Sequence, residues 1–423
     1  MLQRECFVRV LIAVFGSYGD ILPFISIGCE LQSRGHEVRM YGSANFEQTA
    51  RAKGLTFSSL GDPNEYQTVV SDANVGRPVY GWRHLAPYLD RFVRLSFRAM
   101  RADVIPGQTL AIGSTLAFSV NLLRELDAIP TVAVHLSPAA LRSEFDAPKL
   151  LEHFPGPSLP RITKRAAFAI LDHLFLDPMI GTHLNRYRAE LGLPAIRRVF
   201  NKAIHDADLT VGMFPEWFAP AQPDWPPGIK LTGFPLADQA RTECENIDAF
   251  LAAGPAPIGF SAGTQTAAAQ RFFTTSMEVC QRLGRRGILL TPHADQIPAG
   301  LPPGLAHFTF APFEQLLPRL SAFVHHGGIG SVSHALRAGT PQLIRPTAFD
   351  QFENARRTVQ LGVAKQVMVR DYTTHHVAGL LDQLIKDEEV KARCLAWAKK
   401  FDGNPVLETC ALIIKLFDQR LSG

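Results

Sequence analysis

One pattern recurs in both halves of this chain and constrains its fold more than any other feature: a short apolar run, a glycine-rich turn and then a helical pattern. The runs cover residues 7–15, 258–260 and 322–325, and the turns after them are GSYG at 16–19, SAGT at 261–264 and GGIGS at 327–331. A strand, a tight turn and a helix in this order build parallel sheets. The sequence therefore predicts an α/β protein made of two doubly wound, Rossmann-like domains.

A proline-rich stretch separates the two halves. Residues 215–235 hold six prolines, which break regular elements, and the polar residues 237–246 follow them. A chain of 423 residues is long enough for two or three domains. The expected organisation is an N-terminal domain over 1–236, a linker over 237–250, a C-terminal domain over 251–405 and a last helix over 406–423.

Composition limits the class of partner and the compartment. Lys and Arg total 43 against 39 Asp and Glu, a net charge of +4, which excludes a disordered acidic chain and gives no support for nucleic-acid binding through bulk charge. Six cysteines without a CxxC pair indicate reduced thiols in a cytoplasm. The apolar run 7–15 is shorter than the ~20 residues that span a bilayer. A soluble cytoplasmic protein is expected, and peripheral association with the inner face of a membrane stays open.

The aromatic composition is biased toward phenylalanine. The chain has 28 Phe against 7 Tyr and 4 Trp, and many of these Phe residues fall in the first half. Packing of sheets and helices explains most of them. A subset that lines an apolar pocket would suit a hydrophobic, lipid-like ligand.

The turn at 327–331 has the chemistry of an anion site. Ligands of doubly wound sheets bind at the carboxyl ends of the strands, so we expect the glycine-rich turns to face a cleft between the two domains. Glycines let a phosphate approach the backbone, and the N-terminus of the following helix offers unpaired N–H groups. His326 can donate to a phosphate oxygen. The P-loop lysine is missing, which disfavours an ATPase, and the spacing does not fit the dinucleotide fingerprint GxGxxG.

Asp350 and Gln351 follow the next predicted strand and should open a helix at the same edge. A carboxylate beside a carboxamide offers acceptors and donors together, which suits the vicinal hydroxyls of a sugar. A helix N-cap is the alternative role for Asp350.

These motifs together resemble the donor signature of family 1 glycosyltransferases. The matching segments are HHGGIGS at 325–331, GTPQLIRP at 339–346, DQFENA at 350–355, GSYGDILPF at 16–24 and FAPFEQLLP at 310–318. The resemblance covers essentially the whole chain and implies the GT-B fold, in which two Rossmann-like domains face each other across a cleft and the C-terminal helix crosses back onto the first domain. Over 214–226 and 232–236 the chain is also similar to the rhamnosyltransferases of rhamnolipid biosynthesis.

The resemblance assigns donor-binding roles residue by residue. His326 aligns with the histidine that contacts the pyrophosphate, and Asp350 and Gln351 align with the pair that holds the donor sugar. The other implied donor-binding residues are the backbone cradle Gly328, Gly330 and Ser331, the turn Gly263 and Thr264, the base-stacking Phe310 and its neighbour Ala311. His334 stands where plant members have a ribose-binding Glu, which is suggestive of a deoxyribose donor.

The implied catalytic base is Asp20. It occupies the place of the histidine base of plant members, and Ser114 lies in the region of their supporting Asp. A positioned base contributes about 100- to 10,000-fold to such a transfer. Helix capping is the alternative role of Asp20. Ser17, Tyr18 and His135 are candidate acceptor-binding residues, although a place in the core is equally compatible with His135.

The sequence also contains the letters of a metal-binding DxD motif at Asp206-Ala207-Asp208. It precedes a strand of the first half, away from the donor signature, and we interpret it as a chance match. The expected reaction is thus an inverting, metal-independent transfer from a dTDP- or UDP-linked sugar, without a further cofactor.

Two readings of the substrate remain open. The first is transfer of L-rhamnose from dTDP-L-rhamnose to a 3-(3-hydroxyalkanoyloxy)alkanoic acid, which gives a mono-rhamnolipid. The second is transfer from UDP-glucose to a sterol, a polyketide or another apolar aglycone. A nicotinamide oxidoreductase lacks its glycine fingerprint here, and a non-catalytic partner would have no need of His326, Asp350 and Gln351.

Overall fold

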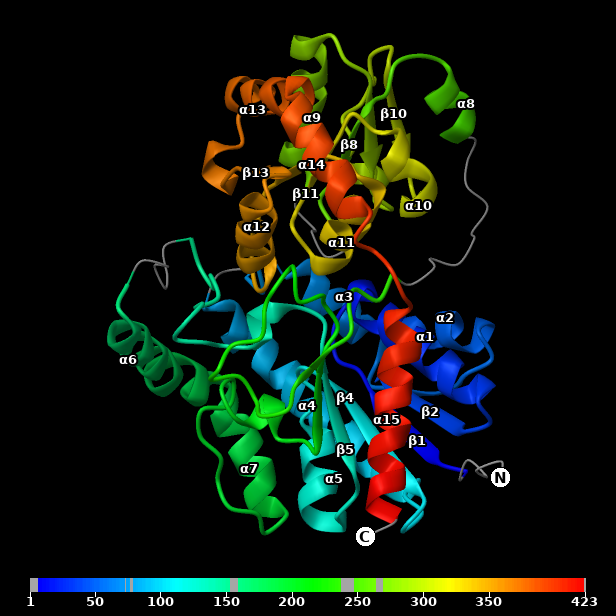
Figure 1. Cartoon of the computed structure of the whole chain (residues 1–423), viewed down its shortest axis with the longest axis vertical. Coiled ribbons are helices and arrows are strands. Elements are labelled where there is room, and N and C mark those ends of the chain that lie inside the picture. The colour runs from blue at the N-terminus through cyan, green and yellow to red at the C-terminus, as the bar shows by residue number, and fades with distance from the viewer. Residues whose placement is uncertain are drawn as a thin grey trace. The chain divides into compact units, whose positions relative to one another are not determined.

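The computed structural model describes residues 7–72, 74–76, 79–152, 159–236, 247–263 and 269–421 (Figure 1). The chain forms two compact units. The first combines residues 1–148, 153–237 and 404–423, and the second combines 149–152 with 238–403. Of the expected linker, residues 237–246 lie outside the described residues, and helix α8 (Ile247–Ala252) begins directly after them.

A seven-stranded parallel sheet is the centre of the first unit. Its order is β3-β2-β1-β4-β5-β6-β7. The strands are β1 (Arg9–Ala13), β2 (Glu37–Ser43), β3 (Thr56–Leu60), β4 (Thr109–Ser114), β5 (Thr131–His135), β6 (Leu209–Gly212) and β7 (Lys230–Leu231). The middle strands are buried almost throughout, as expected of parallel strands that are covered on both faces.

Helices cover this sheet. They are α1 (Tyr18–Ser33), α2 (Glu47–Ala52), α3 (Pro63–Ser71), α4 (Gly81–Ala102), α5 (Ser119–Asp127), α6 (Arg161–Leu171), α7 (Thr182–Glu190) and α15 (Pro405–Leu421), with a π-helix at Asp172–Gly181 between α6 and α7. The last helix, α15, packs against α1 within this unit, drawn in red beside blue in Figure 1. The hydroxyls of Thr232 and Thr409 lie 2.9 Å apart and tie α15 to the segment after β7.

A six-stranded parallel sheet is the centre of the second unit. Its order is β10-β9-β8-β11-β12-β13. The strands are β8 (Ile258–Ser261), β9 (Gly287–Leu290), β10 (Leu305–Phe308), β11 (Ala322–His325), β12 (Gln342–Ile344) and β13 (Ala364–Gln366). The remaining helices are α9 (Gln270–Leu283), α10 (Phe313–Leu316), α11 (Ile329–Ala338), α12 (Gln351–Gln360), α13 (Thr374–Lys386) and α14 (Glu388–Ala398). The predicted pair of parallel α/β sheets is confirmed.

The phenylalanines of the first unit divide between core and surface. Phe92, Phe97, Phe118 and Phe168 are buried and Phe200 is half-buried, whereas Phe145 and Phe175 are exposed and Phe154 lies outside the described residues. Most of the excess therefore packs the core. In the described part of the chain, no helix combines the length and the apolar character needed to cross a bilayer.

Candidate active site

Three adjacent strands of the second unit bring the predicted donor residues to one edge of its sheet. Strands β8, β11 and β12 are hydrogen-bonded neighbours, and all run in the same direction. Gly263 follows β8, His326 follows β11, and the segment that leads to Asp350 follows β12. The topology therefore places these turns side by side at the carboxyl ends of the strands.

His326 lies against two glycines at this edge. A Cβ atom at position 263 would lie 2.8 Å from Cε1 of the imidazole, and one at position 328 would lie 2.5 Å from its Nε2. Only a residue without a side chain lets the ring occupy this place. Nδ1 of His326 is buried and has no hydrogen-bond partner among the described residues. Burial, and then the charge of Arg345, lowers the pKa of His326 to about 4, so the ring is neutral near pH 7.

The neighbouring His325 has a structural role. It is completely buried, Nδ1 accepts a hydrogen bond from the N–H of Gly327 at 3.1 Å, and Nε2 lies 3.0 Å from Oε1 of Gln342. Burial lowers its pKa to about 3. Because Nδ1 accepts, the proton sits on Nε2, and this tautomer fixes the turn from which His326 projects.

Helix α11 begins at this turn. Gly328 is the N-cap residue, and the first bond of the helix runs from the N–H of Val332 to the carbonyl of Gly328. The N–H groups of Ile329, Gly330 and Ser331 therefore have no partner within the helix. Together with the positive end of the helix dipole, they can donate to an anion beside His326.

Asp350 and Gln351 are held in place by their neighbours. Phe349 has a φ of +54°, a backbone conformation that side chains larger than glycine rarely adopt. Asp350 is at the N-cap position of α12, but its Oδ2 accepts from Asn354 at 2.7 Å instead of capping the backbone. The same Asn354 amide donates to the carbonyl of Gly327 at 3.0 Å. Helix α12 is thus bonded to the turn that precedes α11.

The amide of Gln351 is oriented by three hydrogen bonds to one atom. Its Oε1 accepts from the N–H and the hydroxyl of Thr347, both at 2.8 Å, and from the N–H of Ala348 at 3.2 Å. These bonds leave the Nε2 donor for a ligand.

The predicted nucleobase residues lie farther along the same edge. Phe310 and Ala311 follow β10, two strands away from β8. Phe310 is half-buried and Ala311 is buried, and no described contact links either of them to His326. His334 packs edge-on against Phe313, with ring centroids 5.7 Å apart. Thr264 lies outside the described residues.

Asp20 has a specific environment in the first unit. Its Oδ2 accepts from the N–H of Ser17 at 2.7 Å and from the hydroxyl of Ser17 at 2.9 Å, so the carboxylate belongs to a capping box at the start of α1. Gly16 allows this approach, since a Cβ atom there would lie 2.3 Å from Oδ2. Burial raises the pKa of Asp20 above the ordinary 3.8, and the two bonds from Ser17 oppose that shift.

The other candidates of the first unit differ in exposure. Tyr18 is 38% exposed and packs edge-on against Phe46, with ring centroids 4.9 Å apart. Ser114, in the position of a supporting acid, instead accepts a hydrogen bond from the N–H of Phe15 at 3.1 Å. Its hydroxyl therefore bonds to the segment that follows β1 and does not support Asp20.

His135 has the environment of a core histidine. It is completely buried, Nδ1 lies 3.0 Å from the hydroxyl of Thr115, and Nε2 lies 2.9 Å from Nδ1 of His205. Both ring nitrogens therefore have protein partners. Burial, followed by the neighbouring His205, lowers the pKa of His135 well below the ordinary value. His135 is therefore not part of the acceptor site that we propose.

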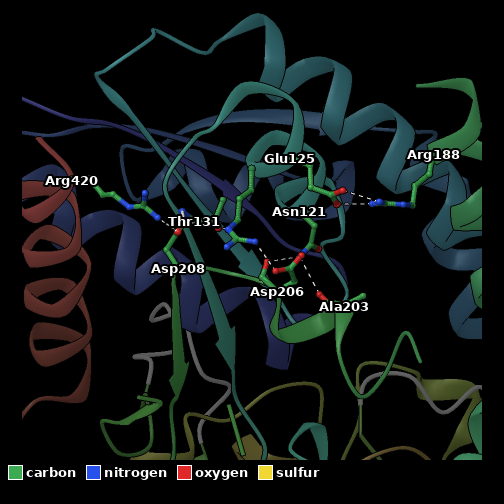
Figure 2. A network of polar contacts seen from close by, with 9 residues as sticks. Asn121, Glu125, Thr131, Arg188, Ala203, Asp206, Asp208 and Arg420 are labelled. Carbon is green, nitrogen blue, oxygen red and sulfur yellow. Dashed lines mark hydrogen bonds and ion pairs between the residues drawn. The ribbon is translucent and has the colours of Figure 1, made fainter. Parts of the chain in front are cut away.

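The two carboxylates of the DxD sequence have protein partners in the first unit (Figure 2). Both residues precede β6 and therefore lie at the amino end of that strand. Asp208 accepts from the N–H of Thr131 at 2.9 Å and pairs with Arg420 of α15, while Asp206 pairs with Arg124 at 2.6 Å. Within the described ranges, no three His, Cys, Asp or Glu side chains gather as a metal site would require. These two aspartates join α5, β6 and α15.

Two family models match the chain. The model described as "Erythromycin biosynthesis protein CIII-like, C-terminal domain" matches residues 287–411, and the "Glycosyltransferase family 28 N-terminal domain" matches residues 10–90. The chain is also 27% identical over 410 residues to the glycosyltransferase GtfE of Amycolatopsis orientalis, which covers 94% of this chain and 95% of that one. The chain is a glycosyltransferase.

Solved structures with the same fold confirm the GT-B architecture of this glycosyltransferase. The glycotransferase of kitacinnamycin superimposes with a TM-score of 0.75 at 18% identity and covers 97% of this chain and 100% of that one. The spinosyn rhamnosyltransferase SpnG, solved with thymidine diphosphate, superimposes with a TM-score of 0.66 at 18% identity and covers 96% and 100%.

Two residues of the candidate site are not predicted from the sequence. Asn354 bonds Asp350 to the turn of β11, and Arg345 is a buried cation directly after β12. The signal for Asn354 was its place four residues after Asp350, which is one helical turn. An arginine at the end of a strand carries no such signal, because most arginines lie on the surface.

Proposed function

We propose that this glycosyltransferase moves L-rhamnose from dTDP-L-rhamnose to the hydroxyl of a 3-(3-hydroxyalkanoyloxy)alkanoic acid, with inversion and without a metal. The observation that carries the donor side is the joint placement of His326, the free N–H groups of α11 and the pair Asp350-Gln351 at neighbouring strand ends. A nucleotide-sugar requires donors for its diphosphate next to side chains that can bond to the hydroxyls of its sugar, and these groups offer both.

On the donor side, the diphosphate is the leaving group. One N–H of neutral His326 and the N–H groups of residues 329–331 donate to its oxygens, and they stabilise the charge that develops as the anomeric bond breaks. Asp350 accepts from hydroxyls of the sugar, and Gln351 donates to them through Nε2. Gly263 and Gly328 leave the space that the imidazole occupies.

On the acceptor side, Asp20 is the base. The acceptor oxygen attacks the anomeric carbon, its proton passes to the carboxylate of Asp20, and the electrons of the broken carbon–oxygen bond leave with dTDP. A raised pKa makes this carboxylate a better match for proton transfer near neutral pH than an ordinary Asp. Ser17 orients it through two hydrogen bonds, and the exposed Tyr18 next to it is available to an acceptor.

Thymidine is favoured over uridine by residue 334. A buried histidine packed against Phe313 stands where a ribose-binding carboxylate would be needed. The likeness to a rhamnosyltransferase solved with thymidine diphosphate supports the same choice. The UDP-glucose alternative predicts the opposite nucleotide preference. This alternative also includes apolar acceptors other than a lipid. Two structural neighbours have kitacinnamycin and spinosyn in their names, which suits this alternative.

A lipid-like acceptor is supported by an exposed apolar stripe on α6 and the π-helix. Ile162, Ile170 and Leu174 are 76%, 54% and 60% exposed and recur at intervals of eight and four residues, so they share one face. The first turn of α6 contains Arg161 and no acidic residue. A positive charge at this end of the helix is repelled by the helix dipole, but it is attracted to an anionic membrane surface. We therefore include peripheral contact with the cytoplasmic face of a membrane in the proposal.

A thermal-shift panel tests the proposed donor. At 100 times its Kd, a ligand stabilises the folded protein by ~2.7 kcal/mol. We expect dTDP and dTDP-L-rhamnose to raise the melting temperature clearly more than UDP and UDP-glucose at equal concentration. His326→Ala should remove most of the shift, whereas His376→Gln, an exposed site in α13, should keep it. A larger shift with UDP-glucose would favour the alternative, and no shift with any nucleotide would overturn both.

A further inference from the structure

We propose that Arg345 is the cation that binds the β-phosphate of the nucleotide-sugar. This phosphate is bonded to the donor sugar before the transfer and is the terminal phosphate of dTDP after it. This inference rests on the proposed function and adds a residue to its donor site.

Arg345 stands directly after β12, at the same sheet edge as His326. Its backbone N–H donates to the carbonyl of His325 at 2.8 Å, so the ends of β11 and β12 are bonded at this point. The residue is 8% exposed. Its charge acts on His326 and helps to lower the pKa of that imidazole, which agrees with the two side chains being close.

Arg345 differs from the other buried arginines in its partners. Arg142, Arg188 and Arg357 are at most 9% exposed, and each pairs with a carboxylate, at 2.5, 2.6 and 2.5 Å respectively. No hydrogen bond or ion pair of the Arg345 guanidinium occurs among the described residues. A buried charge without a partner is costly, and proteins therefore pair such charges. The structure thus contains a buried guanidinium whose natural partner is an anion from outside the chain.

Two aromatic rings hold the guanidinium without using its N–H groups. Its central carbon lies 4.9 Å from the ring centre of Phe272 and 5.3 Å from that of Tyr372. The two rings are stacked, 5.1 Å apart, and the hydroxyl of Tyr372 lies 2.9 Å from that of Ser276. Contacts with ring faces fix the plane of a guanidinium, while its N–H donors stay available at the edge. This fork matches two oxygens of a phosphate.

The order of the strands selects the β-phosphate. Along the sheet edge, Phe310 follows β10, His326 follows β11, and Arg345 and the Asp350-Gln351 pair follow β12. A nucleotide-sugar with its base near Phe310 and its sugar near Asp350 would place the β-phosphate on the β12 side of His326. Because His326 is neutral, it contributes a hydrogen bond and no charge. Arg345 supplies the positive charge that a diphosphate needs.

Calorimetric titration of dTDP and dTMP into the full chain tests this role. Wild-type protein should bind dTDP much more tightly than dTMP. Arg345→Met keeps the apolar contacts with Phe272 and Tyr372 but removes the charge, and it should weaken dTDP by roughly 30-fold or more while dTMP changes less than about threefold. Arg345→Lys should recover part of the difference. Arg337→Met, which removes an exposed positive charge from α11, is the matched control and should behave as wild type.

The outcomes separate this inference from the proposed function. If Arg345→Met binds dTDP as tightly as wild type, or loses dTDP and dTMP equally, Arg345 only packs between the aromatic rings and the inference is wrong. If wild-type protein binds neither nucleotide, the proposed function itself fails. Melting curves of the variants check that each one is folded before titration.

Discussion

Gly328 leaves the space that the imidazole of His326 fills: a Cβ atom at position 328 would lie 2.5 Å from Nε2 of the ring. Gly328 has an ordinary negative φ of −58°, so this contact, and not the backbone, excludes a larger residue. The proposed donor site therefore requires the absence of a side chain at position 328 as well as the imidazole of His326.

Gly328→Ala should displace His326 and weaken donor binding while the protein still folds. Overpacking of this kind costs ~1–3 kcal/mol, which corresponds to about 5- to 150-fold in the Kd of dTDP. Gly379→Ala, in α13 with no atom near the added methyl group, is the control and should bind dTDP normally. Unchanged dTDP affinity in Gly328→Ala would show that the position of His326 is unimportant for the donor.

Asp20→Asn should lower turnover about 100- to 10,000-fold and leave the dTDP affinity unchanged, because the base acts on the acceptor. Steady-state rates and titrations measure the two quantities separately. Glu30→Gln, at the other end of α1 in an ion pair with Arg34, is the control and should keep full turnover. Preserved turnover in Asp20→Asn would leave Asp20 with the capping role alone.

The pH profile gives a second test of Asp20. Its raised pKa places the acid limb of kcat/KM above the ordinary 3.8 of a carboxyl group. The hydroxyl of Ser17 lowers that pKa through its hydrogen bond. Ser17→Ala should therefore move the acid limb to higher pH, and a shift to lower pH would contradict the assignment of this limb to Asp20.

Sequence patterns predict the positions of the strands in the second unit better than they predict the side-chain contacts of its candidate site. The run 322–325 coincides with β11, because a short, continuously apolar strand between a loop and a glycine turn has few alternatives. The sequence predicts Asp350 at the start of a helix, which is where it lies, but its carboxylate bonds to Asn354 and does not cap the backbone. The preceding Phe349 has a φ of +54°, which no local pattern reveals.

Long-range contacts explain what else the sequence did not reveal. Residues 149–152 belong to the second unit, although they lie within the first half of the chain. Buried Glu353 holds them, because its Oε2 accepts from the N–H of Lys149 at 2.7 Å. The π-helix at Asp172–Gly181 likewise contains Pro178, which would be expected to end a regular helix. Such features depend on tertiary packing that a single sequence does not display.

Glu353→Gln should destabilise the second unit strongly. Glu353 is completely buried, and its Oε1 pairs with Arg356 at 2.7 Å and Arg357 at 2.5 Å. Glu353→Gln removes the buried negative charge with which both arginines pair, at a cost of ~3–5 kcal/mol. Urea unfolding followed by circular dichroism measures this loss. Glu388→Gln, in an exposed pair with Lys391, should lose at most ~1 kcal/mol. Equal effects of the two variants would contradict the argument.

Asp208→Asn should lower stability by ~1–3 kcal/mol without lowering turnover of the folded protein, since Asp208 bonds to Thr131 and Arg420 at the amino end of the sheet. Asp206→Asn, at a more exposed pair, should have a smaller effect. A chelator should leave wild-type turnover unchanged. Loss of turnover in a chelator, with recovery on added Mg²⁺ or Mn²⁺ in wild type but not in Asp208→Asn, would restore the DxD motif as a metal site.

Acid should destabilise the fold through its buried histidines, which are His135, His205, His325 and His326. Their folded pKa values lie below the ordinary 6.5, so the unfolded chain binds more protons and the free energy of unfolding falls as the pH drops below about 6.5. Each contributes a slope of up to ~1.4 kcal/mol per pH unit until its own folded pKa, about 4 for His205. His205→Gln should reduce the slope between pH 6 and 4.5 by one such contribution, and the exposed variant His376→Gln should not.

The central claim is transfer of a deoxysugar from a thymidine nucleotide to a lipid hydroxyl. Mass spectrometry of a reaction with purified protein, dTDP-L-rhamnose and a 3-(3-hydroxyalkanoyloxy)alkanoic acid tests it directly, with UDP-glucose and Asp20→Asn protein as parallel reactions. We predict a lipid product that carries one deoxyhexose, formed with release of dTDP, absent with UDP-glucose and strongly reduced with Asp20→Asn. A glucosylated product from UDP-glucose, or no product from dTDP-L-rhamnose, would contradict it.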